Sequence, residues 1–194
     1  MKTLKNTKHR SSKTRLSREG GATFVEVLTS LLILSFGSLG AASLQITSKQ
    51  AAYDAQQMLS ATFLTNGIVE RMRNNPGALD VYASADVGNG SIALEPMPNC
   101  VQANPCNSAQ LALHDLWVWE QSIDGESMKS GDKKVGGLVN PKGCIINDNG
   151  RVQVIVSWHG MDSLSDAASV SGGMVSCGTE TSHRRQIVVN TFIE

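Results

Sequence analysis

Hydrophobic and polar positions divide the chain into four stretches of different character. Residues 1–21 are strongly polar, residues 27–48 contain no charged side chain, and residues 49–75 mix apolar with polar positions without a proline. Residues 76–194 contain all 5 prolines. At about 1.5 Å per residue, the run 27–48 forms a helix of about 33 Å, which is long enough to cross the hydrocarbon core of a bilayer. The pattern therefore predicts a membrane-spanning helix close to the N-terminus.

The helical pattern continues beyond the uncharged run. Apolar residues between positions 49 and 75 recur at helical spacing and form a stripe along one face. The stripe consists of Ala51, Ala55, Met58, Leu59, Thr62, Val69 and Met72, whereas Gln56, Gln57, Ser60 and Arg71 fall away from it. The helix is expected to end at Asn75, because the residue before a proline disfavours the helical conformation. We expect one helix over residues 22–75, with 22–48 in the membrane or in an assembly and 49–75 packed on a domain.

Residues 76–194 carry the signals of a small domain. Residues 76–106 and 124–143 are rich in Pro, Gly and polar residues and are expected to be irregular. A helix is expected over about 108–122, because Asn107 and Gln110 fit a capping box and an apolar stripe follows them. This stripe consists of Ala112, Leu116, Trp119 and Ile123.

Three strands are expected, over about 144–147, 151–158 and 185–193. The first two flank Asp148-Asn149-Gly150, in which Asn-Gly favours a tight hairpin turn. Apolar residues alternate from Val152 to Trp158, so they share one face of the sheet. The expected fold class is α+β: a long N-terminal transmembrane helix packed on a small antiparallel β-sheet domain.

The formal net charge of zero hides an uneven distribution. Residues 1–21 contain seven basic side chains and one acid, whereas the rest of the chain has six more acids than bases. Basic residues beside a membrane span stay on the cytoplasmic side, so we expect the N-terminus in the cytoplasm and residues 49–194 on the other side. No nucleic-acid partner is expected, because no aromatic side chains interleave the basic ones.

The four cysteines all lie in the part of the chain that is expected outside the cytoplasm. An even number in an oxidising compartment favours disulfides. Three pairings are possible, and we expect Cys100 with Cys106, which are close in sequence, and Cys144 with Cys177, which flank neighbouring strands. The cysteines and histidines show no zinc-ligand spacing, so no metal and no cofactor is expected.

An acid interrupts the apolar helix near its start. Glu26 directly precedes the uncharged run, and burying a carboxylate near mid-bilayer costs on the order of 3 kcal/mol. Cleavage after Gly21 would create an amine at Ala22, four residues before Glu26, and so supply a positive charge. A secretory signal peptide with cleavage near Ala41-Ala42-Ser43 is an alternative that the pattern leaves open.

The junction Gly21-Ala22-Thr23-Phe24-Val25-Glu26, followed by the apolar run, resembles the class III signal of type IV prepilins. The resemblance implies a pilin-like fold in which Gly21 is the last residue of a cleaved leader, residues 1–21. It also implies that Ala22 is N-methylated by the prepilin peptidase and that Glu26 compensates the terminal amine of a neighbouring subunit. Major pilins usually have Phe at the position of Ala22, and the sequence here is more similar to minor pilins of the PilV type.

Two further segments, Cys106 to Trp119 and Val156-Ser157-Trp158, are similar to PilV-type minor pilins. The family implies a structural subunit that supports pilus biogenesis, twitching motility and adhesion. Its implied partners are other minor and major pilins, the prepilin peptidase, the inner-membrane assembly platform and inner-membrane lipid. The implied location is the bacterial inner membrane, spanned once with residues 76–194 in the periplasm, and then the pilus fibre at the cell surface.

Other functions fit parts of the same pattern. A type II secretion pseudopilin has the same plan, and an unprocessed, membrane-anchored periplasmic binding domain would share its anchor. An enzyme would need a catalytic constellation. His114-Asp115 and His159 with Asp162 are present, but neither a nucleophile elbow nor a phosphate-binding loop accompanies them. We therefore expect no catalytic residues.

Overall fold

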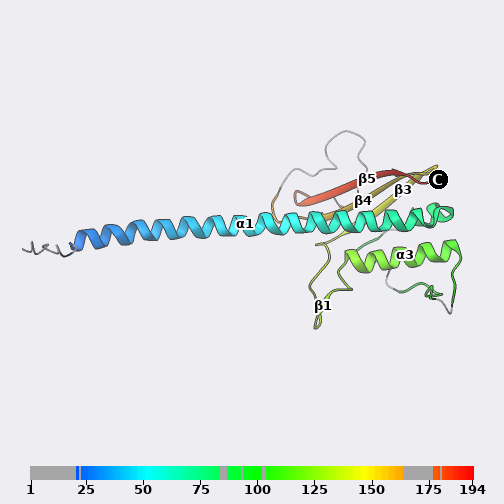
Figure 1. The fold of residues 1–194 in the computed structure, drawn as a ribbon, viewed down its shortest axis with the longest axis horizontal. Coiled ribbons are helices and arrows are strands. Elements are labelled where there is room, and N and C mark those ends of the chain that lie inside the picture. Colours follow the sequence, from blue (N-terminus) through cyan, green and yellow to red (C-terminus); the bar gives the residue numbers. More distant parts are fainter. Residues whose placement is uncertain are drawn as a thin grey trace, which may run out of the picture. The chain divides into compact units, whose positions relative to one another are not determined.

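The computed structural model describes residues 21, 23–83, 87–92, 94–101, 104–163, 177–179 and 181–194. The chain divides into two compact units, Met1–Gln45 and Ile46–Glu194. Helix α1 (Phe24–Arg73) belongs to both, and a three-stranded antiparallel sheet lies in the second unit (Figure 1). The predicted pilin-like α+β fold, with its long N-terminal apolar helix and small antiparallel sheet, is confirmed.

The described part of the first unit is dominated by the first turns of α1. Every residue from Thr23 to Lys49 is exposed. Among the described residues, α1 is the one helix that is long and apolar enough to cross a membrane. Residues 1–20 of the predicted leader and Ala22 lie outside the described residues.

The outer half of α1, residues 46–73, packs into the core of the second unit with a face that overlaps the predicted one only in part: Val69 and Met72 are buried as predicted. Its buried residues are Gln57, Ala61, Thr65, Ile68, Val69 and Met72. Met58 and Leu59, predicted on the packed face, are 57% and 61% exposed, and Gln57, predicted on the polar face, is buried. At these three positions the prediction was wrong, because this half of the helix has apolar side chains on more than one face. The packed face also accommodates polar groups: Thr65 Oγ1 donates a hydrogen bond to the carbonyl oxygen of Ala61 at 2.7 Å.

The sheet has the order β3–β4–β5, with both pairs antiparallel. Its strands are β3 (Lys142–Asp148), β4 (Arg151–His159) and β5 (Arg184–Phe192). The turn between β3 and β4 uses Asn149 and Gly150 at positive φ, which is the conformation that Asn-Gly favours. Residues from Val152 to Trp158 of the central strand are buried at every position except Gln153, so the strand is covered on both faces.

Helix α3 (Ser108–Ile123) closes the core from the other side of α1. Asn107 Oδ1 accepts from the Gln110 N–H at 2.9 Å, and Gln110 Oε1 accepts from the Asn107 N–H at 3.0 Å, which completes the predicted capping box. The four apolar residues predicted to form its stripe are all buried. Trp119 Nε1 donates to the carbonyl oxygen of Leu64 at 3.0 Å, so α3 lies directly against the outer half of α1 (Figure 1).

Two segments that were expected to be irregular contain short regular elements. Residues 76–82 form the 3-10 turn η1 (Pro76–Ala78) and the helical turn α2 (Leu79–Tyr82). Residues 129–134 form a hairpin from β1 (Lys129–Ser130) and β2 (Lys133–Lys134). A long-range contact stabilises the first, because Tyr82 is fully buried and donates to Asp115 of α3. Local ion pairs of Glu126 with Lys129 and Lys134 stabilise the hairpin.

Candidate functional site

The first turn of α1 brings together the residues that were predicted to direct assembly. Thr23 Oγ1 accepts a hydrogen bond from the Glu26 N–H at 3.3 Å, and the carbonyl oxygen of Thr23 accepts from the Val27 N–H at 3.1 Å. Thr23 therefore caps the helix, and Glu26 lies in the first turn, where the helix dipole favours a carboxylate. Gly21 and Glu26 are both exposed. The partner that was predicted for Glu26, the amine of Ala22, lies outside the described residues.

The turns that follow form an apolar surface with no core of their own. Twelve large apolar side chains between positions 24 and 46 are 44–78% exposed: Phe24, Val25, Val27, Leu28, Leu31, Leu32, Ile33, Leu34, Phe36, Leu39, Leu44 and Ile46. The hydroxyls of this segment donate to the helix's own carbonyls, as Ser30 does to Glu26 at 2.7 Å and Ser35 to Leu31 at 2.7 Å. A helix that is apolar on all sides, and whose hydroxyl groups form hydrogen bonds within the helix, is suited to a lipid bilayer or to packing against other apolar helices.

The outer half of α1 adds a second apolar surface. Leu59 and Phe63 are 61% and 76% exposed and lie one turn apart on the side of the helix that faces away from its buried residues. Met58, which is 57% exposed, lies on another side and lines a hollow with Trp158 and Arg185. Exposed apolar side chains that follow one another along a helix face are typical of an interaction surface. This part of α1 therefore contacts its own domain with one face and leaves apolar side chains exposed on the other.

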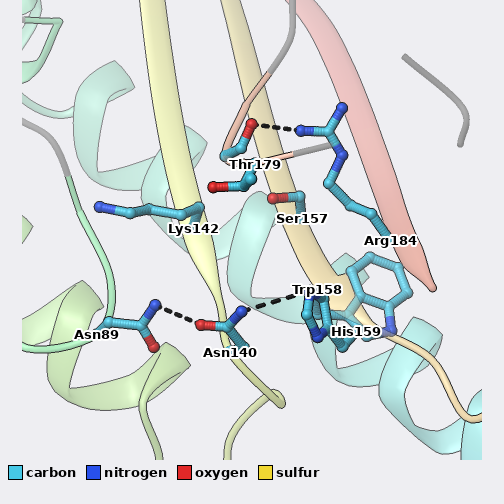
Figure 2. A pocket seen from close by; sticks show the side chains of 9 residues that line it. Asn89, Asn140, Lys142, Ser157, Trp158, His159, Thr179 and Arg184 are labelled. Atoms are coloured by element: carbon cyan, nitrogen blue, oxygen red, sulfur yellow. Dashed lines mark hydrogen bonds between the residues drawn. The ribbon is translucent and has the colours of Figure 1, made fainter. Parts of the chain in front are cut away.

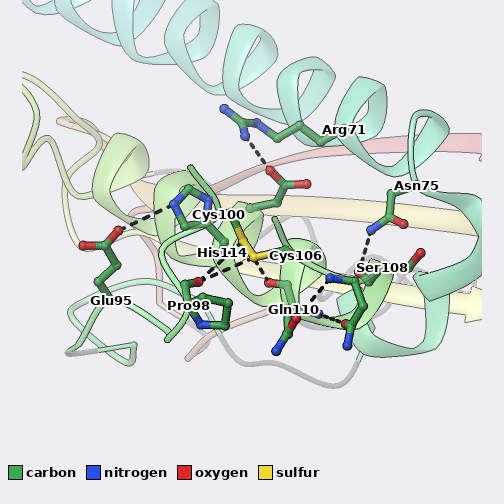
Figure 3. Close-up of a disulfide and its surroundings, with 11 residues drawn as sticks. Arg71, Asn75, Glu95, Pro98, Cys100, Cys106, Ser108, Gln110 and His114 are labelled. Atoms are coloured by element: carbon green, nitrogen blue, oxygen red, sulfur yellow. Dashed lines mark hydrogen bonds and ion pairs between the residues drawn. A yellow bond between two sulfur atoms is a disulfide. The ribbon is translucent and has the colours of Figure 1, made fainter. Parts of the chain in front are cut away.

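Both predicted disulfides are present in the structure. Cys100 pairs with Cys106 and Cys144 pairs with Cys177, and no cysteine is free. The Cys100–Cys106 bridge lies beside the beginning of α3, where Cys100 Sγ is 3.8 Å from the carbonyl oxygen of Gln110 (Figure 3). This contact ties the preceding loop to α3.

The Cys144–Cys177 bridge ties strand β3 to residues 177–179. Two buried side chains fix the backbone there: Ser157 Oγ donates to the carbonyl oxygen of Cys177 at 2.7 Å, and Arg184 donates to the same oxygen at 3.0 Å. Arg184 is only 2% exposed, and a buried charge is costly unless polar groups surround it. The carbonyl oxygens of Cys177 and Gly178, which accept from its guanidinium, supply these groups. The second unit, residues 46–194, which we call the head, is thus held together by disulfides and hydrogen bonds in addition to its hydrophobic core.

A buried polar network, which the sequence analysis missed, joins α1, α2 and α3. Asp115 accepts from Arg71 at 2.6 Å and from the Tyr82 hydroxyl at 2.6 Å. Burial, and then the hydrogen bond to Asp115, raises the pKa of Tyr82, so its hydroxyl keeps the proton that it donates. Asn75 adds a hydrogen bond to the carbonyl oxygen of Ser108 at 2.8 Å (Figure 3). No local pattern would have predicted these contacts, since the residues are far apart in the chain.

A second missed feature is a pair of acids, Glu120 on α3 and Asp124 directly after it, that hold the loop 87–92. The carboxylate of Glu120 is fully buried and accepts from the Gly88 N–H, the Ser91 hydroxyl and the Ile92 N–H at 2.6–2.8 Å. Asp124 accepts from the N–H groups of residues 89 and 90 at 2.9 and 2.8 Å. The sequence did contain one indication that Glu120 is buried: it lies four residues after Leu116, on the apolar side of the helix.

The residues that an enzyme hypothesis would use are not brought together. Asp115 is bound to Arg71 and Tyr82, while His114 lies 3.6 Å from Glu95. His159 lines a small cavity of about 80 Å³, where its polar partners are the amide of Asn140 and the hydroxyl of Thr181, both at 3.4 Å (Figure 2). In the described ranges, no group of three or more potential metal ligands is present.

Comparison with known proteins gives one family. The family model described as Tt1218-like, type IV pilin Tt1218, matches residues 43–117. The matched segment contains the end of the apolar run, the outer half of α1 and the first turns of α3. No curated protein and no solved structure gives a significant match to the chain.

The fold and the apolar helix place the chain in a class, that of pilin-like structural proteins. Over residues 43–117 the chain is similar to a type IV pilin, and this similarity supports a place in a pilus assembled with other pilins. The apolar N-terminal helix fits membrane anchoring. The match does not extend to the PilV family.

Proposed function

We propose that the protein is a minor pilin of a type IV pilus, of the PilV type. The observation that carries the proposal is the first half of α1: it is apolar, exposed on all sides, and begins with a single acid, Glu26. A soluble domain would not leave so much apolar surface uncovered. The similarity of residues 43–117 to a type IV pilin supports the same function.

The proposed life of the subunit has two stages. In the first, α1 crosses the bacterial inner membrane once, with the basic leader in the cytoplasm and the disulfide-bonded domain in the periplasm, the compartment in which disulfides form. In the second, the prepilin peptidase cleaves after Gly21 and methylates Ala22. The assembly platform then moves the subunit into the fibre among other minor and major pilins, where it supports pilus biogenesis, twitching motility and adhesion.

Glu26 would act by electrostatics rather than by chemistry. A carboxylate in an apolar environment is costly unless a positive charge lies close to it. The new amine of Ala22 on a neighbouring subunit would supply that charge and would be compensated in turn. The pair would therefore form only when two helices meet in the correct register, so that Glu26 selects the register of assembly.

Substitution of Glu26 by Val tests this proposal. We expect Glu26→Val to insert into the membrane as the wild type does, because the change makes the helix more apolar, but to be absent from sheared fibres. Thr29→Val is the matched control, since Thr29 lies in the next turn and its hydroxyl is satisfied within the helix. Fibres that contain the Glu26→Val subunit at the wild-type level would contradict the proposed role.

A further inference from the structure

Residues 177–179 contact all three strands of the main sheet, although they belong to no helix or strand themselves. The Cys144–Cys177 bridge attaches them to β3. Ser157 of β4 and Arg184 of β5 both donate hydrogen bonds to the carbonyl oxygen of Cys177. We call residues 177–179 the bridged segment. It links the three strands near one end of the sheet.

The bridged segment supplies acceptors to a buried positive charge. Arg184 is 2% exposed, and its Nη1 donates to the carbonyl oxygen of Cys177 at 3.0 Å and to that of Gly178. In Figure 2 its guanidinium lies beside Thr179. Taking a charge out of water is costly, and the cost becomes much larger when its acceptors are removed. The burial of Arg184 therefore depends on where the bridged segment lies.

The bridged segment fits closely against the sheet at a conformationally free residue. Gly178 has a φ of +83°, and a Cβ at this position would lie 3.2 Å from Ser157 Oγ and 3.3 Å from the Cβ of Lys142. Glycine loses more conformational freedom on folding than any other residue, so fixing Gly178 in this place has a large entropic cost. A covalent link to β3 reduces this cost, because it confines the segment before the carbonyl groups are ordered.

Arg184 has access to water if the bridged segment leaves. A cavity of about 80 Å³ adjoins both of them, and its lining includes His159. His159 is the partner of Arg184 in the β4–β5 register, at the end of the sheet. A guanidinium that has lost its acceptors is more stable in water than in a buried site. Movement of Arg184 into water would separate the end of β4 from the beginning of β5.

We propose that the Cys144–Cys177 bridge is a redox-sensitive switch for the burial of Arg184. With the bridge formed, the bridged segment covers the guanidinium, and the ends of β4 and β5 are closed. With the bridge reduced, the guanidinium enters water and these ends open. In the reduction, a dithiol gives two electrons and two protons, the disulfide becomes two thiols, and the dithiol becomes a disulfide. The switch concerns the folding of the head and does not rest on the proposed function.

A double-mutant cycle between the bridge and Arg184 tests the switch. Its members are the wild type, Arg184→Met, the pair Cys144→Ala with Cys177→Ala, and the triple variant, each unfolded in urea as the full chain in detergent micelles. Removal of the bridge should lower the folding equilibrium constant at least about tenfold less in Arg184→Met than in the wild type, because hydrogen bonds to a charged group contribute about this factor or more.

Arg185→Met is the matched control for this cycle. Arg185 is the half-buried neighbour of Arg184, and its Nη2 donates to the carbonyl oxygen of Asp162 at 2.7 Å, outside the bridged segment. Its effect should add to that of the bridge within about twofold. If Arg184→Met is equally additive, the carbonyl oxygens keep their place without the bridge, and the proposal is wrong.

Hydrogen exchange in the variant without the bridge shows where the structure opens. The Gly160 N–H donates to the carbonyl oxygen of His183 at 2.8 Å, beside Arg184, and the Ile193 N–H donates to that of Gly150 at 2.9 Å, at the other end of the same strands. Protection at Gly160 should fall at least about tenfold more than protection at Ile193. An equal fall at both amides would indicate a general loss of stability and would overturn the proposal.

A redox titration measures the same coupling without any cysteine substitution. The full chain is equilibrated with mixtures of reduced and oxidised dithiothreitol, and the free thiols are alkylated and assigned by mass. Coupling is reciprocal, so Arg184→Met should lower the ratio of reduced to oxidised dithiothreitol at which Cys144–Cys177 is half reduced by at least about tenfold. Arg185→Met should leave this ratio unchanged. An unchanged ratio in Arg184→Met as well would refute the switch.

Discussion

Glu120 offers the sharpest test of how the head is held together. Its carboxylate is fully buried and accepts three hydrogen bonds, from two backbone N–H groups and the Ser91 hydroxyl, at 2.6–2.8 Å. Glu120→Gln retains the shape but replaces one oxygen by an NH₂ group. In the better of its two orientations, the NH₂ group faces the Ile92 N–H, and two donors then oppose each other.

The expected loss of stability follows from these contacts. An unsatisfied buried N–H costs about 1–3 kcal/mol, and the two remaining hydrogen bonds lose about 0.5–1 kcal/mol each when their acceptor becomes neutral. The free energy of unfolding should therefore fall by about 3 kcal/mol, which is a large part of the roughly 5–15 kcal/mol that is typical of proteins. Asp124 still holds residues 89 and 90, so the loop should loosen without detaching.

Urea unfolding of the purified full chain in detergent micelles measures this loss, and hydrogen exchange at Gly88 and Ile92 shows where it arises. Both amides should exchange faster in Glu120→Gln. The control is Glu70→Gln, which removes an exposed carboxylate that pairs with Arg73 on the surface, where less than about 1 kcal/mol is expected. A loss below about 0.5 kcal/mol for Glu120→Gln would refute the idea that this carboxylate organises the loop.

Two further predictions concern the other links in the head. Replacement of Cys144 and Cys177 by Ser should lower the free energy of unfolding by about 3–4 kcal/mol. The same replacement of Cys100 and Cys106 should lower it by only about 2 kcal/mol, because that bridge closes the shorter loop. Equal losses in urea unfolding would contradict this order. Because Lys129 and Lys134 lower the pKa of Glu126, the contribution of these ion pairs is present above the ordinary Glu pKa of 4.5 and is lost as the pH falls through the lower folded value. The protection of the hairpin amides from hydrogen exchange, taken relative to the intrinsic rate at each pH, should accordingly be higher at neutral pH than in acid. Glu126→Gln should show the low protection at both pH values.

Local signals in the sequence predicted the elements that depend on neighbouring residues. The capping box of Asn107 and Gln110 and the Asn149-Gly150 turn are each complete within a few residues, so the pattern contains all of their contacts. The alternation in β4 was equally informative, since a central strand between two partners is buried wherever it is apolar. The disulfide pairing agreed with the expectation because it follows from the order of these elements.

The rotation of α1 could not be predicted in the same way. Met58 and Gln57 are adjacent, and hydrophobicity alone assigns the core to Met58, whereas the structure buries Gln57 and exposes Met58. The outer half of α1 has apolar side chains on more than one face, and the sequence of a single chain does not indicate which face packs on its own domain. The network of Asp115 with Arg71 and Tyr82 was hidden for a related reason: its members come from three separate elements.

The central claim is that cleavage after Gly21 creates the amine that Glu26 needs. The most direct measurement is the intact mass of the protein purified from the membranes and fibres of the cells that produce it. We predict a chain that begins at Ala22, carries one additional methyl group and retains both disulfides. A chain that still begins at Met1, or that begins near Ser43, would contradict the claim.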